Sequence, residues 1–141
     1  MEQAALEAID DRLLASWDSG DADAFLDLPA EDFVWYDWTS PEPIRDLEAA
    51  RAYFSSWTTA IPDMKTTSRV RILGDDSFAT EIVWTGTNSG PFATPAGELP
   101  ATGRSVTGRG TYFAFVRDGK VAEFRSHPDV AGVMAQLGVG G

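Results

Sequence analysis

Four polar side chains that could act together lie near the C-terminal end of the sequence: Glu123, Arg125, His127 and Asp129. A carboxylate or an imidazole can remove a proton from a carbon next to a carbonyl group, and a guanidinium can hold the oxygen on which negative charge develops. His127 is the only histidine, and histidine is the side-chain type that changes charge near neutral pH. The segment favours acid–base chemistry with Asp129 or His127 as the base and Arg125 at the oxygen.

Two structural questions about this segment stay open in the sequence. Asp129 follows Pro128 at the start of a helical pattern, so its carboxylate could instead cap the helix, which would stabilise its charge and make it a poor base. Strand alternation places Val121, Glu123, Arg125 and His127 on one face and Ala122, Phe124 and Ser126 on the other. Either face could line a cavity, and in the second case Ser126 is the pocket residue.

The first half of the chain is predicted to be mostly helical. Apolar residues at helical spacing predict a helix over 3–17, a short one over 21–28 ended by Pro29, and a third that contains Leu47 and Trp57 and ends before Pro62. Between them, 33–38 alternates two faces as a strand does.

The second half is predicted to be a β-meander. The segments 66–73, 78–86, 106–117 and 120–127 are rich in strand-forming residues and are separated by turn residues, among them Asp118-Gly119, a strong hairpin marker. Strands joined by such short turns pair antiparallel. The order of helices followed by strands predicts an α+β fold with helices against one face of a curved sheet, and the Gly- and Pro-rich segment 87–105 is expected to be a long loop that covers a binding site.

Aromatic residues from several elements are expected to meet inside this fold. Tyr36 is predicted to donate a hydrogen bond to a developing oxyanion, because a tyrosine hydroxyl can do so in a dry site. Simple core packing is the alternative for each aromatic residue. The residues expected to contact substrate are Trp17, Val34, Trp38, Phe54, Trp57, Trp84, Tyr112 and Phe124.

Several short motifs occur in one order along the chain, and together they resemble the SnoaL-like polyketide cyclases of the NTF2-like superfamily. The run from Asp118 to Asp129 resembles that family's DGKI-x-E-H-W-x-x-x-D, and a helix ending in QLG follows it. The other matching places are Gly20-Asp21, Asp32-Phe33-Val34, Ala60 to Met64, Gly86-Thr87 and Thr102-Gly103-Arg104. The chain departs from the pattern at Phe124-Arg125, Asn88 and Phe115.

The resemblance implies a single NTF2-like domain over 1–141, a cone in which helices and a strongly curved, mostly antiparallel sheet enclose an apolar cavity. It also implies a homodimer, no cofactor, and Asp129 at the position of the cyclases' general base. We therefore expect an enzyme, a cyclase or isomerase acting on an apolar, carbonyl-bearing, polyketide-like molecule bound in the central cavity. The alternatives are a pocketed binding or dimerising protein without catalysis, or an epoxide hydrolase or dehydratase of the same fold.

Composition excludes several other classes of protein. A net charge of −11 opposes binding to nucleic acid or to anionic membranes, whose partners need clusters of Lys and Arg. With no cysteine and one histidine, the chain has no pattern for a zinc or iron site. The start of the sequence is acidic and unlike a secretory signal, and no apolar run is long enough to span a membrane, so we expect a cytoplasmic protein.

Overall fold

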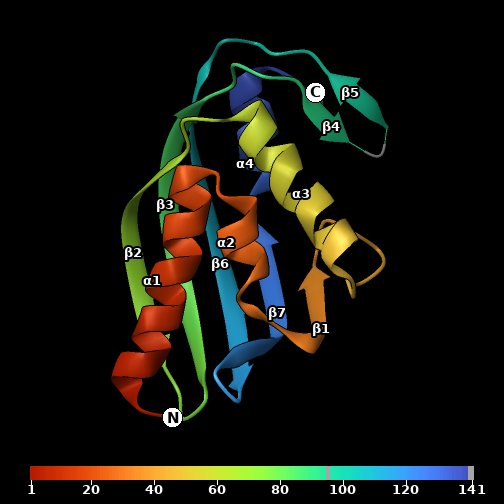
Figure 1. Ribbon diagram of the computed structural model, residues 1–141. Coiled ribbons are helices and arrows are strands. Elements are labelled where there is room, and N and C mark those ends of the chain that lie inside the picture. The colour runs from red at the N-terminus through yellow and green to blue at the C-terminus, as the bar shows by residue number, and fades with distance from the viewer. Residues whose placement is uncertain (95, 140–141) are drawn as a thin grey trace.

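The computed structural model of the protein describes residues 1–94 and 96–139 (Figure 1). Its helices are α1 (Gln3–Ser19), α2 (Ala22–Leu26), α3 (Leu47–Ala60) and α4 (Val130–Leu137). Its strands are β1 (Pro29–Asp37), β2 (Lys65–Leu73), β3 (Ser77–Thr87), β4 (Phe92–Thr94), β5 (Gly97–Leu99), β6 (Ser105–Arg117) and β7 (Lys120–Pro128).

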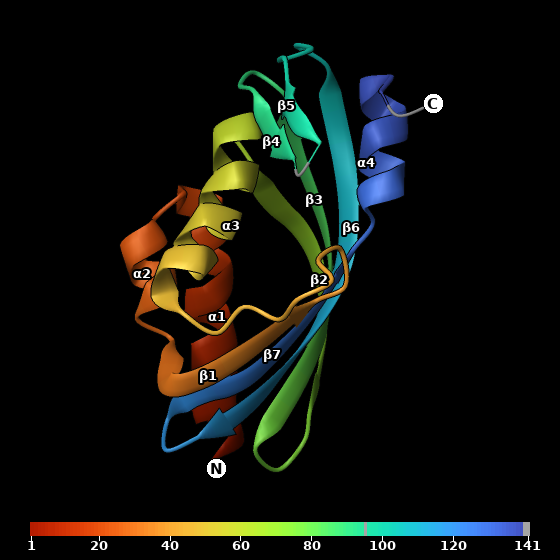
Figure 2. The ribbon, with the colours of Figure 1, turned by 90° about the vertical axis from the view of Figure 1, so that its right-hand side faces the viewer.

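Five strands form one curved sheet in the order β1-β7-β6-β3-β2, in which β1 is parallel to β7 and the other neighbours are antiparallel. The helices α1, α2 and α3 lie on the concave side of this sheet (Figure 2). The predicted α+β architecture, with helices against one face of a curved sheet, is therefore confirmed.

Local residue chemistry explains where the elements end. Asp118 and Gly119 have φ values of 53° and 76°, the left-handed conformation that a tight turn between β6 and β7 requires. Gly20 ends α1 in the same conformation, with φ of 68°. Asp21 and Asp46 cap α2 and α3 by accepting from the backbone N–H groups of Ala24 and Ala49.

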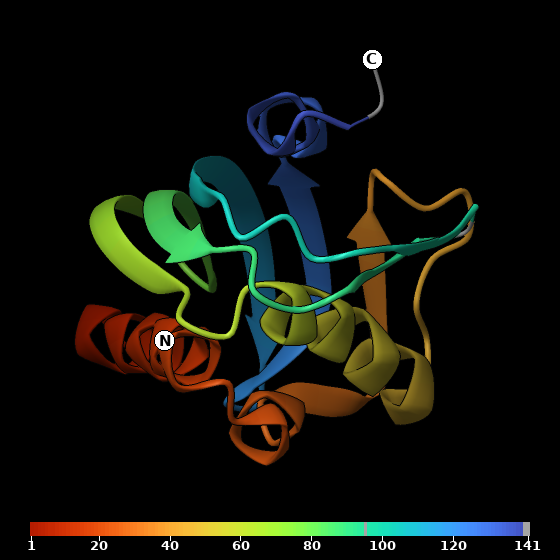
Figure 3. The same ribbon diagram turned by 90° about the horizontal axis from the view of Figure 1, so that it is seen from above.

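One feature differs from the sequence-based expectations. The segment predicted as a long loop contains the small hairpin of β4 and β5. The last helix, α4, lies apart from the other three, beyond the end of β7 and beside β6 (Figure 3). There the side chain of Gln136 donates to the carbonyl of Thr107 and accepts from its N–H, both at 2.8 Å. It thus supplies hydrogen-bond partners to backbone groups of β6 at a position beyond the end of its pairing with β7.

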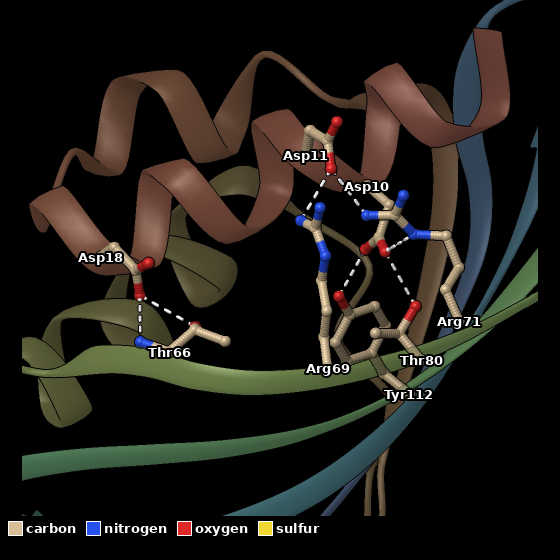
Figure 4. A network of polar contacts seen from close by, with 8 residues as sticks. All are labelled: Asp10, Asp11, Asp18, Thr66, Arg69, Arg71, Thr80 and Tyr112. Carbon is tan, nitrogen blue, oxygen red and sulfur yellow. Dashed lines mark hydrogen bonds and ion pairs between the residues drawn. The ribbon is translucent and has the colours of Figure 1, made fainter. Parts of the chain in front are cut away.

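A buried network of polar contacts joins α1 to the sheet (Figure 4). The side chain of Asp10 is fully buried. Its Oδ2 accepts hydrogen bonds from Nε of Arg71 at 2.6 Å and from the hydroxyl of Thr80 at 2.8 Å, and its Oδ1 accepts from the hydroxyl of Tyr112. One carboxylate thereby connects α1 to β2, β3 and β6, and Arg71 balances its charge.

No helix in the described part of the chain is long and apolar enough to cross a membrane.

We predict that Asp10→Ala lowers the free energy of unfolding by about 3–5 kcal/mol. The change leaves the largely buried guanidinium of Arg71 and the buried hydroxyls of Thr80 and Tyr112 without their acceptor. The matched control is Asp11→Ala. Asp11 is next along the same helix and is also paired with Arg71, but the Asp11 side chain is 53% exposed. That change should cost less than about 1 kcal/mol. Urea unfolding measures both, and equal losses would contradict the structural role of Asp10.

Candidate active site

A cavity of about 100 Å³ lies between the concave face of the sheet and the helices α1 and α3. Aliphatic side chains such as Leu13 and Ile82 form part of its wall, and seven of its eighteen lining residues are Trp, Tyr or Phe. The aromatic residues that line it are Trp17, Trp35, Tyr53, Trp57, Trp84, Tyr112 and Phe124. The cavity is thus an apolar chamber with few polar groups.

Close packing of one indole helps to define the cavity wall. Trp84 of β3 is paired with Gly108 of β6, and a side-chain carbon at Gly108 would lie 2.1 Å from the Trp84 ring. Only glycine leaves room for the indole to lie across the neighbouring strand.

The face of β7 that lines the cavity is the one that carries Phe124 and Ser126. A bulge at Ala122 explains this, because Glu123 pairs with Phe115 and Val121 pairs with Val116, which leaves Ala122 as an extra residue. Val121 is buried on the inner side, and the extra residue then directs Glu123 to the outer side. Of the two alternatives that the sequence left open, the structure has the one with Ser126 in the pocket.

Arg125 and Tyr36 lie on the outer, convex face of the sheet. Nε of Arg125 is 2.7 Å from Oε2 of Glu123, and the guanidinium lies 5.2 Å from the centre of the Tyr36 ring. The two residues are paired across β1 and β7, so their side chains share a face. The expectation that they project into the cavity is wrong for both, because Arg125 follows the bulge on β7 and Tyr36 alternates with the buried Trp35 on β1.

His127 has its imidazole on the same outer face. The ring lies 5.8 Å from the centre of the Trp38 ring and 5.8 Å from that of Phe113, both exposed aromatic residues. His127 is among the residues that line the cavity, although its imidazole packs against these outer aromatic rings. Trp38, expected to contact substrate, is 57% exposed and lies outside the cavity.

Asp129 caps α4, which is the alternative role that the sequence suggested. Its Oδ1 accepts from the N–H of Gly132 at 2.9 Å, and the residue is exposed. It borders a shallow groove of about 370 Å³ that also includes Glu81 and Val83 of β3. These strand positions point to the convex face, so the Asp129 carboxylate is directed away from the aromatic cavity.

Five of the eight residues expected to contact substrate line the cavity: Trp17, Trp57, Trp84, Tyr112 and Phe124. Phe54 does not, because it is fully buried behind Trp17, with ring centres 4.3 Å apart. Val34 borders a separate small gap of about 20 Å³ near β1.

The polar end of the cavity is built around Asp37, which the sequence-based reasoning did not select. Asp37 ends β1 and is 2% exposed. Its Oδ2 accepts from the hydroxyls of Tyr53 at 2.6 Å and Ser126 at 2.5 Å, and both of these residues line the cavity. Its Oδ1 accepts from the backbone N–H of Thr39 at 3.0 Å and from the Thr39 hydroxyl.

Ser126 is held in place from two sides. Nε1 of Trp35 donates to its Oγ at 2.8 Å, while its own hydroxyl donates to Asp37. The serine oxygen is thus fixed between an indole and a carboxylate at the cavity wall. Such an arrangement can pass a proton from a bound molecule to Asp37.

Tyr53 is a hydrogen-bond donor at this end of the cavity. Burial, and then the charge and hydrogen bond of Asp37, raise the pKa of Tyr53 far above its ordinary value. The phenol therefore keeps its proton at any physiological pH. At the other side of the cavity, burial and Asp10 raise the pKa of Tyr112 in the same way.

Within residues 1–94 and 96–139, no group of three or more His, Asp or Glu side chains is placed to hold a metal ion.

Comparison with known proteins gives a consistent family assignment. The family model described as SnoaL-like polyketide cyclase matches residues 7–137. A search of the curated proteins gives no match.

Solved structures with the same fold include three proteins of bacterial origin. AclR, a candidate hydroxylase of Streptomyces galilaeus, has a TM-score of 0.84 at 20% identity, covering 97% of this chain and 83% of AclR. A candidate SnoaL-like polyketide cyclase of Jannaschia sp. CCS1 has a TM-score of 0.83 at 18% identity, covering 98% and 94%. IdmH, a candidate polyketide cyclase of Streptomyces antibioticus, has a TM-score of 0.77 at 27% identity, covering 98% and 100%.

We predict that the two buried tyrosines make the protein sensitive to alkaline pH. Their pKa is raised on folding, so the unfolded chain releases protons above about pH 10 that the folded protein keeps. Stability is complete below that pH and falls as pH rises, by about 1.4 kcal/mol per pH unit for each tyrosine. Tyr53→Phe and Tyr112→Phe should each remove one such contribution from the slope measured by urea unfolding.

The control for this prediction is Phe124→Leu, which removes packing from the same cavity wall but keeps both tyrosines. It should lower stability at every pH without changing the slope. Slopes that are the same in all four proteins would contradict the expected raised pKa values.

Proposed function

The chain belongs to the SnoaL-like polyketide cyclase family, and from this membership we propose that it is a cyclase or isomerase that removes a proton next to a carbonyl group. The substrate is a small, largely apolar carbonyl compound bound in the aromatic cavity. The chain's own carboxylate and hydroxyl groups perform the acid–base steps.

One observation carries the proposal: a buried carboxylate, Asp37, lies behind two hydroxyl groups in the wall of a largely apolar cavity. Proton transfer from carbon needs a base held in a site from which water is excluded. Aromatic walls exclude water, and the Ser126 oxygen connects the cavity to the carboxylate.

The proposed reaction moves one proton and one electron pair. The bond between the acidic carbon and its hydrogen breaks, the proton passes to Oγ of Ser126, and the serine's own proton passes to Asp37. The electron pair moves to the carbonyl oxygen and gives an enolate. In a cyclase the enolate carbon then attacks a second carbonyl of the same molecule, and in an isomerase the proton returns to another carbon.

Tyr53 is suited to stabilise the enolate oxygen. In the resting site its hydroxyl donates to the charged carboxylate of Asp37. When Asp37 receives the proton it loses its charge, and the Tyr53 hydroxyl can then donate to the oxygen that has gained charge. The hydrogen bond is therefore stronger in the transition state than in the ground state, which is the condition for catalysis.

The free volume of the cavity limits the substrate. Pockets for drug-sized ligands usually measure about 300–1,000 Å³. A cavity of about 100 Å³ fits a small molecule or the reacting end of a larger one.

We predict that Asp37→Asn reduces turnover at least a hundredfold, the lower range for loss of a general base, while the fold is kept because asparagine fills the same space. The measurement is deuterium incorporation next to the carbonyl of a panel of small aryl and alkyl ketones in D₂O, followed by NMR. Ser126→Ala should show a comparable loss, because it interrupts the proton path.

Asp129→Asn is the matched control for Asp37→Asn. Asp129 is an exposed helix cap, so its replacement should leave the exchange rate within about twofold. A reversed result, with full loss in Asp129→Asn and none in Asp37→Asn, would assign the base to Asp129 as the family resemblance implies.

We further propose that the convex face of the sheet joins two copies of the chain into a homodimer. One row of side chains crosses this face from Ile72 through Ala79, Phe113 and Arg125 to Tyr36, as the strand pairing dictates. Val70 and Ile72 are 58% and 70% exposed, and Phe115 is 42% exposed. An apolar surface of this kind is typical of a protein interface.

Placing a charge on this face should separate the copies. Ile72→Asp and Phe115→Asp are each expected to change the mass in light scattering from twice 15.3 kDa to 15.3 kDa. The control is Leu47→Asp, which alters a residue with 51% exposure at the start of α3, away from the sheet face. A wild-type protein with the monomer mass would overturn the dimer proposal.

A further inference from the structure

We infer that the ligand of the aromatic cavity carries a small alkylammonium group, either a protonated tertiary amine or a quaternary ammonium. This inference rests on the proposed function, because it names the substrate class of the same cavity. It is carried by the charge of Asp37, by the nature of the cavity wall and by the cavity's size.

The first observation is a buried negative charge that lacks a cation. Within the described residues, the groups that donate to Asp37 are the hydroxyls of Tyr53, Ser126 and Thr39 and one backbone N–H, all neutral. No Lys, Arg or His side chain of the described chain forms an ion pair with it.

The second buried carboxylate of the protein makes the contrast clear. Asp10 is equally inaccessible, but Nε of Arg71 lies 2.6 Å from its Oδ2. Burial of a carboxylate without a cationic partner is costly. A cation in the cavity would balance Asp37 across the Tyr53 and Ser126 hydroxyls that separate them, and not by direct contact as Arg71 does for Asp10.

The second observation is the wall of seven aromatic side chains, four of them tryptophans. The faces of aromatic rings attract cations, tryptophan most strongly, and quaternary ammonium groups are bound by cages of this kind. Arg109 is the only arginine or lysine among the lining residues, and strand alternation directs its side chain to the convex face. No basic side chain of the cavity lining therefore occupies the ring faces.

The third observation is size. A cavity of about 100 Å³ is smaller than the pockets of about 300–1,000 Å³ that hold drug-sized ligands, so it has room for a small group. A trimethylammonium or dimethylammonium head group is of that size. The net charge of −11 adds a long-range attraction for cations.

An ammonium group also fits the proposed chemistry. During proton removal the negative charge passes from Asp37 to the substrate oxygen, and both positions lie at the same end of the cavity. A cation held among the aromatic rings is close to the negative charge before and after this step. It therefore contributes mainly to affinity, and less to the rate of the step itself.

The binding test compares choline with 3,3-dimethylbutan-1-ol, which has the same shape but carbon in place of the charged nitrogen. Calorimetry and quenching of tryptophan fluorescence measure both. We expect choline to bind at least tenfold more tightly than the alcohol to the wild-type protein. Equal affinities, or tighter binding of the alcohol, would overturn the inference.

Variants locate the binding in this cavity. Asp37→Asn should weaken choline at least tenfold and leave the alcohol unchanged, whereas Asp129→Asn should change neither. Trp57→Leu is a second variant, which removes one aromatic ring of the wall and keeps the Asp37 carboxylate, and it should also weaken choline more than the alcohol. Circular dichroism shows that each variant is folded, and choline affinity unchanged by both Asp37→Asn and Trp57→Leu would overturn the inference.

A second pair of probes separates the inference from the proposed function. The ketones 1-(dimethylamino)propan-2-one and 4-methylpentan-2-one have the same skeleton, with nitrogen in the first at the position of a CH group in the second. The rate of enzymatic deuterium exchange of each ketone is divided by the rate of its exchange without enzyme. Faster enzymatic exchange of the amino ketone at low concentration supports both proposals. Equal exchange of both ketones would support the function and refute the inference, whereas choline binding without any exchange would refute the function and leave the inference standing.

Discussion

The position of α1 over the sheet depends on one buried carboxylate. Asp10 accepts hydrogen bonds from three strands at once, and its charge is balanced by Arg71. Apolar contacts alone would allow a helix to slide on a sheet, since they have little direction, but a carboxylate with three donors has one position at which all are satisfied. The cavity lies beside this fixed point, and Tyr112 belongs both to the network and to the cavity wall.

The two buried carboxylates have different consequences because their partners differ. Asp10 has a cation and no access to the cavity except through Tyr112, so its function is to hold elements together. Asp37 has hydroxyl partners, two of which line the cavity, and no ion-pair partner among the described residues. Burial of a charge that no side chain balances lowers stability, and such sites persist where the charge is used. These contacts are the basis on which we propose Asp37 as the base.

The sequence was sufficient to predict the architecture and the apolar part of the cavity, because both follow from periodic patterns. The elements are identified by their helical stripes, their strand segments and the Asp118-Gly119 turn. Trp57 and Trp84 lie at apolar positions of these patterns, and both line the cavity. The reactive end could not be predicted in the same way. Both faces of β1 carry aromatic residues, Trp35 with Phe33 on one and Tyr36 with Val34 on the other, so composition does not show which face is buried. An aspartate at the end of the Trp35 face was the one available indication.

The bulge at Ala122 determines which side chains of β7 face the cavity. In a regular strand, the buried Val121 would bring Glu123 and Arg125 to the inner face, where a guanidinium could pair with Asp37 and cancel its charge. The extra residue turns Glu123, Arg125 and His127 outward and brings only the Ser126 hydroxyl to the wall. Because side chains alternate with a period of two, one inserted residue exchanges the two faces completely. The ion pair and the histidine then belong to the convex surface, and the Asp37 carboxylate lies behind the Ser126 and Tyr53 hydroxyls of the cavity wall, with no ion-pair partner among the described residues.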